Sequence, residues 1–88
     1  MGNQEFINIC KAKVAEYHNE KRDKTDAAGD LAVNDVFVVW SCKTLQNHKA
    51  LLSTPVSDGM YYECTYNGDK NELYFDAYKK WENIKFEM

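Results

Sequence analysis

The spacing of apolar residues changes near residue 35, and this change limits the possible folds more than any other feature. Before it, apolar residues recur at intervals of three and four: Phe6, Ile9, Cys10, Val14 and Tyr17. This spacing predicts one amphipathic helix over residues 4–22, with Asn3 as its N-cap. After residue 35, the side chains alternate with a period of two, which is typical of strands.

Turn sequences divide the second part of the chain into four strands. The turns are Thr44 to Asn47, Ser57-Asp58-Gly59 and Asn67-Gly68-Asp69-Lys70. Residues 35–79 are therefore predicted to form a four-stranded antiparallel meander, which with the helix gives an α+β fold. A chain of 88 residues is long enough for a single domain only, so we assign residues 1–88 to one domain. Residues 80–88 fit neither period cleanly, and they could form a bulged strand end or a helical turn followed by a short strand.

The strand pattern separates two sheet faces. The first is apolar and is expected to lie under the helix: Val36, Val38, Trp40, Cys42, Ala50, Leu52, Met60, Tyr62, Cys64, Tyr66, Leu73, Phe75 and Ala77. The second is mixed, and its apolar or aromatic members are Phe37, Val39, Leu51, Tyr61, Tyr74 and Tyr78. One helix cannot cover both faces. Either residues 80–88 or the loop 24–34 cover the second face, or it contacts a partner protein or a second copy of the chain.

Polar residues gather at the tip of the first predicted hairpin: Lys43, Gln46, Asn47 and Lys49. They could contact an anionic or amide-rich partner, or they could form an ordinary solvated turn. The same two alternatives apply to Asn67, Asp69 and Lys70, which we expect at the opposite turn.

The sequence offers little for catalysis. His18 and His48 lack neighbours at metal-ligand spacing, and we expect both on the surface. The four glycines are scattered, so no phosphate-binding loop is predicted. The three cysteines are widely spaced, which favours plain core residues: Cys10, Cys42 and Cys64. We therefore expect neither enzymatic activity nor a metal or cofactor.

Charge and hydropathy narrow the classes of partner. The net charge is −3 and Arg22 is the single arginine, so nucleic-acid binding is not expected. No apolar stretch approaches the roughly 20 residues that span a bilayer. The first five residues do not form a signal peptide, so we expect a cytoplasmic protein.

Several segments carry a resemblance to a known group of proteins: Val38 to Asn47, Lys49 to Thr54, Asp58 to Glu63, Thr65 to Lys70 and Asp76 to Lys80. The chain resembles a family of small uncharacterised proteins encoded by phages and prophages of Gram-positive bacteria. This resemblance implies a setting in the cytoplasm of a bacterial host. It implies no catalytic residue.

Two hypotheses of function follow from these observations. In the first, the chain is a phage accessory protein that binds and inhibits or redirects a host factor, such as an effector of anti-phage immunity. In the second, an oligomer sequesters a small molecule such as a nucleotide immune signal. Aromatic residues would then stack on the base (Trp40, Tyr62 and Tyr66), and Lys43 or Lys49 would meet a phosphate.

Overall fold

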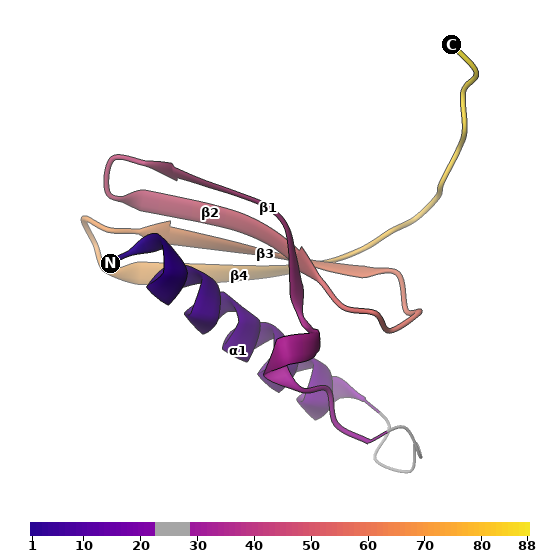
Figure 1. Ribbon diagram of the computed structural model, residues 1–88, viewed down its shortest axis with the longest axis horizontal. Helices are drawn as coiled ribbons and strands as arrows, with labels where there is room; N and C mark the ends of the chain where they lie inside the picture. The colour runs from indigo at the N-terminus through magenta and orange to yellow at the C-terminus, as the bar shows by residue number, and fades with distance from the viewer. Residues whose placement is uncertain (23–28) are drawn as a thin grey trace.

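The computed structural model describes residues 1–22 and 29–88, and it has an α+β architecture (Figure 1). The elements in chain order are the helix α1 (Asn3–Lys21), the 3-10 helix η1 (Val33–Asp35) and the strands β1 (Phe37–Thr44), β2 (Asn47–Ser53), β3 (Met60–Asn67) and β4 (Glu72–Lys79). Each strand pairs antiparallel with the next, in the order β1-β2-β3-β4. The predicted helix and meander sheet are thus confirmed. Among the described residues, no helix is both long and apolar enough to cross a membrane.

The start of α1 differs from the prediction. Gly2 is the N-cap residue and makes no side-chain hydrogen bond, whereas Asn3 is already helical. The prediction that Asn3 caps the helix is therefore wrong. Glu5 in the first turn and Lys21 in the last turn carry the charges that the helix dipole favours at each end.

The core lies between α1 and one face of the sheet. Its fully buried side chains come from both layers: Phe6, Cys10, Val14, Val36, Leu52, Tyr62 and Cys64. Near the end of α1, the Tyr17 ring contacts those of Tyr62 and Phe75, with centroids 5.8 and 5.4 Å apart. Cys10 and Cys64 are buried free thiols, as predicted. A hydrogen bond with Cys64, together with burial, holds the pKa of the Cys10 thiol well above its ordinary value.

A β-bulge in β1 changes which side chains face the helix. Val38 lies opposite Leu52, but Trp40 lies opposite Leu51, so Val39 is an extra residue in the ladder. Directly opposed residues share a face, and the bulge therefore turns Trp40 and its i+2 neighbour Cys42 away from α1. The prediction that these two residues face the helix is wrong, and Cys42 is exposed rather than part of the core.

The β1–β2 and β3–β4 turns lie at the same end of the sheet, not at opposite ends (Figure 1). They contact one another there, because the Gly68 amide donates to Asn47 Oδ1 at 3.1 Å. A Cβ atom on Gly68 would lie 2.2 Å from the backbone oxygen of Gln46. This close approach requires glycine at position 68.

Residues 80–88 leave the end of β4 and extend away from the sheet (Figure 1). The Lys80 amide donates to the Gly59 carbonyl at 2.7 Å, and beyond it the chain is irregular and exposed. Residues 29–35 lie beside α1 instead, where Asn19 Oδ1 accepts from the Leu31 amide at 2.7 Å. Neither described segment covers the second sheet face, so that alternative is wrong for both; residues 24–28 of the predicted loop lie outside the described residues.

Candidate functional site

The face of the sheet that points away from α1, here called the outer face, is the principal candidate site. Its rows follow from the strand register: Phe37, Tyr61 and Tyr78; Val39 and Trp40 with Leu51, Glu63 and Asp76; and Cys42 with Lys49, Thr65 and Tyr74. The six predicted apolar and aromatic residues all belong to these rows. The structure adds Trp40, which the sequence pattern had assigned to the helix side.

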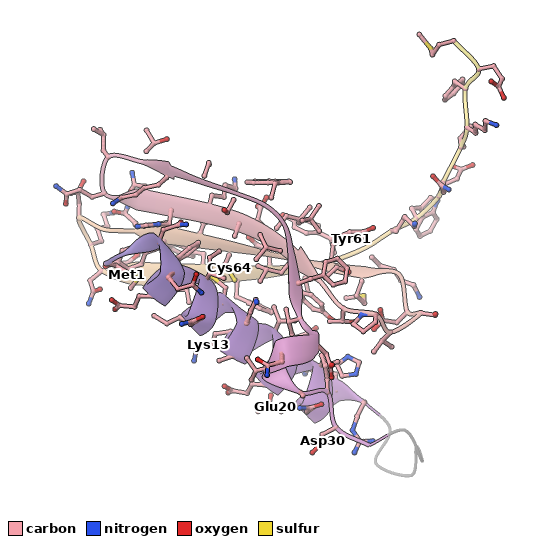
Figure 2. The ribbon with its side chains drawn as sticks, in the orientation of Figure 1. Met1, Lys13, Glu20, Asp30, Tyr61 and Cys64 are labelled. Carbon is pink, nitrogen blue, oxygen red and sulfur yellow. The ribbon has the colours of Figure 1, made fainter. Side chains whose placement is uncertain are left out.

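No described segment shields the outer face from solvent. Trp40 is 42% exposed, Tyr74 54% and Tyr78 51%, and Phe37 and Val39 are exposed to a similar degree. On the inner face, Ala50, Leu52 and Cys64 are fully buried. In Figure 2, Cys64 lies beside α1, and Tyr61 lies near the point where the tail leaves the sheet. Large aromatic side chains therefore form a contiguous exposed surface on one side of the sheet only.

A shallow hollow lies at the end of the outer face from which the tail departs. It has a volume of about 240 Å³, and its lining includes Phe37, Tyr61, Val56 and Lys80. Ser53 forms part of its floor, where its hydroxyl donates to the Met60 carbonyl at 2.9 Å. Hollows of this kind can accept an apolar side chain from a partner.

Polar groups are interspersed with the aromatic residues of the outer face. The Lys49 ammonium lies 3.6 Å from Glu63 Oε1, and Asp76 is the cross-strand neighbour of Glu63. The Tyr74 hydroxyl donates to Glu72 Oε2, and this hydrogen bond raises the pKa of Tyr74. Aromatic residues with a scatter of charges are typical of protein interfaces.

The four polar residues predicted at the first hairpin tip do not form one group. Lys49 belongs to the outer face, whereas Lys43 lies opposite His48 on the inner side. Asn47 bonds to the Gly68 amide, and Gln46 is packed against the same glycine. At the second turn, Asn67 Oδ1 accepts from the amides of Asp69 and Lys70, which stabilises the turn.

The two histidines have environments that differ from the prediction. His48 is only 2% exposed and packs against Phe6, with ring centroids 4.9 Å apart, so the prediction of a surface histidine is wrong. Its Nδ1 atom is buried and has no hydrogen-bond partner within the described chain. His18 is half-buried, with Nδ1 3.8 Å from Asp58 Oδ2. The i+2 spacing of His48, Ala50 and Leu52 was the sequence signal for a buried position.

The geometry also separates residues that could have acted together. Cys42 and His48 point to opposite faces of the sheet, so they are not a nucleophile and base pair. Trp40 is on the outer face while Tyr62 is buried in the core, so the three aromatic residues named for stacking a base do not lie on one surface. In residues 1–22 and 29–88, no cluster of three or more His, Cys, Asp or Glu side chains is placed to hold a metal ion.

Comparison with known families gives a match to a family of unknown function, DUF6275, over residues 7–88. The chain belongs to this family. The DUF6275 match includes most of α1, all four strands and the tail. Comparisons with curated proteins and with solved structures return no match. Membership of DUF6275 agrees with the expected uncharacterised family and transfers no activity to any residue.

Proposed function

We propose that this DUF6275 chain is a non-enzymatic binding protein that contacts another protein through the outer face of its sheet. In the phage setting that the resemblance implies, the partner is a protein in the cytoplasm of the bacterial host, and binding inhibits or redirects it. The observation that carries this proposal is the uncovered aromatic surface opposite the helix.

The total surface area is larger than that of a typical folded monomer of this mass. The chain exposes 6416 Å². A folded monomer of 10.2 kDa is expected to expose about 5,300 Å². Residues 80–88 extend away from the sheet and contribute to this excess of about 1,100 Å², so the excess does not measure the outer face alone. The radius of gyration, 14.5 Å, likewise exceeds the value of about 12 Å expected for this length.

The residue types on the outer face suit an interface. Tryptophan and tyrosine dominate the residues whose truncation weakens binding most, because they bury a large area at a low cost in side-chain entropy. Trp40, Tyr74 and Tyr78 provide such side chains on three different rows of the face. Trp40 lies in the middle of the three rows, with Leu51 and the bulge residue Val39, on the edge strand β1.

The tail provides further apolar surface. Trp81 is 94% exposed, and Ile84, Phe86 and Met88 are also exposed. Lys85 and Glu87 alternate with these residues and pair with each other at 2.9 Å. This alternation is typical of an extended segment that pairs with a sheet. We expect the tail to extend the same interface by lying along the partner.

Native mass spectrometry of the protein isolated from bacterial cells that express it tests the proposal. Three chains are compared: the wild type, the double variant Tyr74→Asp/Tyr78→Asp, and the control Val33→Asp. Val33 is an exposed apolar residue of η1, outside the outer face. The control therefore also introduces an aspartate at an exposed position, but away from the proposed interface.

The proposal predicts an assembly larger than 10.2 kDa for the wild type and for Val33→Asp, and a bare monomer for the double variant. The added mass distinguishes a host protein from a second copy of the chain. A monomeric wild type, or an assembly that the double variant retains, would contradict the proposal.

A further inference from the structure

A second cavity lies on the inner face, at the end of the sheet where the β1–β2 and β3–β4 turns contact one another. Its volume is about 200 Å³, and its lining includes Lys43, Gln46, His48, Tyr66 and Gly68. The start of the chain closes one side, because Met1 also lines it. The cavity therefore lies where the first turn of α1 meets the two hairpin turns.

Three of these residues form one row across the sheet. Lys43 is the cross-strand neighbour of His48, and His48 is the neighbour of Tyr66. Directly opposed side chains share a face, with Cβ atoms about 5 Å apart. A cationic group, an imidazole and an aromatic ring are thus held side by side on three adjacent strands.

The buried imidazole of His48 has no polar partner among the described residues. Phe6 packs against the His48 ring, and the Tyr66 ring lies 6.1 Å from it, centroid to centroid. Nδ1 is enclosed and unpaired within residues 1–22 and 29–88. Because Nδ1 is sealed from solvent, a ligand in the cavity would instead meet the other ring nitrogen, Nε2, which forms no hydrogen bond with any described group.

The charge at the cavity favours an anion. Among the described residues, no aspartate or glutamate lines it and Lys43 makes no salt bridge. The other lysine of this hairpin, Lys49, is paired with Glu63 on the outer face. The Lys43 ammonium is therefore available to an anion next to the histidine, whereas Lys49 is not.

The walls of the cavity are fixed before any ligand arrives. The Tyr66 hydroxyl donates to Asn71 Oδ1 at 2.8 Å, which holds the aromatic ring in place. The Gly68 amide bonds to Asn47 Oδ1, and the lack of a side chain at Gly68 lets the two turns approach closely. A preformed site loses less conformational entropy on binding.

We infer that this cavity binds a small oxyanion, a phosphate or carboxylate group, between the Lys43 ammonium and the His48 imidazole. The imidazole donates a hydrogen bond and the ammonium supplies the charge. The site is separate from the outer face, so it does not depend on the proposed protein contact.

The test is a titration of the untagged chain with anions, in which NMR monitors the ring signals of the histidines. His18 and His48 are the two histidines of the chain, and the variant His18→Gln assigns them. Sodium phosphate, glycerol phosphate and acetate are added in turn at constant ionic strength, with sodium chloride as the reference. The three anions distinguish free phosphate, a phosphomonoester and a carboxylate.

The inference predicts a saturable shift of the His48 ring signals with at least one oxyanion and none with chloride. Lys43→Gln should weaken that binding about tenfold, equivalent to 1.4 kcal/mol, while Lys49→Gln leaves it unchanged. Ring signals that do not move, or that move equally in chloride, would show that solvent alone fills the cavity. Equal effects of the two lysine variants would also overturn the inference.

Discussion

The two faces of the sheet are built from similar numbers of large apolar side chains, but only one of them is covered. On the inner face, α1 buries Leu52, Tyr62 and Cys64 completely. On the outer face, Trp40, Tyr74 and Tyr78 remain about half exposed. A single helix stabilises a four-stranded sheet through one face, so the aromatic content of the other face needs a different explanation. We attribute it to recognition of another protein.

The largest expected difference between the faces is in the free energy of unfolding, when either of two adjacent leucines is replaced. Leu52 is fully buried under α1, and Leu51 is half-buried on the outer face. Leu52→Ala should lower the free energy of unfolding by about 2–5 kcal/mol, because it removes apolar contacts and leaves a cavity. Leu51→Ala should lower it by less than about 1 kcal/mol. Urea denaturation of both variants measures the difference, and equal losses would contradict the assignment of the faces.

A smaller effect tests the bulge that brings Trp40 to the outer face. Val38 faces α1, and Trp40 faces away from it, although their i+2 spacing in a regular strand would put them on one face. Val38→Asp should destabilise the fold by about 2 kcal/mol, because it places an unpaired charge against the core. Trp40→Asp should change the free energy of unfolding by less than about 1 kcal/mol. A Trp40 variant that destabilises the fold more than the Val38 variant would exclude the bulge.

The smallest effect concerns alkaline pH and the buried tyrosine of the inner face. Burial, with a smaller contribution from Asp58, raises the pKa of Tyr62 above its ordinary value of 10.0. The unfolded chain therefore releases this proton before the folded chain does, and stability should fall as the pH rises above about 10. Tyr62→Phe should show a shallower loss of stability over this range. Thermal denaturation from pH 8 to 11 measures it, and parallel curves for the two proteins would contradict the prediction.

The sequence predicted the secondary structure because periodicity and turn residues act locally. The spacing of Phe6, Cys10 and Val14 defines the helix, and Asn67-Gly68 defines the last hairpin. The bulge could not be predicted, because Val38, Val39 and Trp40 are all apolar and fit either register. Only pairing with β2 decides which of them faces α1.

The candidate sites were predicted less completely. The outer-face residues follow from alternation once the strands are known, except for Trp40. His48 was assigned to the surface, although its i+2 spacing with Ala50 and Leu52 puts it on the face that the helix covers. The cavity beside it depends on contact between two turns that are about twenty residues apart in sequence. Such long-range contacts leave no periodic signature.

The most direct test of the outer face as an interface is the rate at which a maleimide labels Cys42, measured by intact mass. Cys42 is the exposed cysteine among the three and lies on the outer face beside Lys49. In the monomeric Tyr74→Asp/Tyr78→Asp variant, one thiol per chain should react rapidly, while Cys10 and Cys64 stay protected. In the wild-type assembly, labelling of Cys42 should be slower by about tenfold or more, because the partner covers it. Equal rates in the assembly and in the monomer would contradict the account.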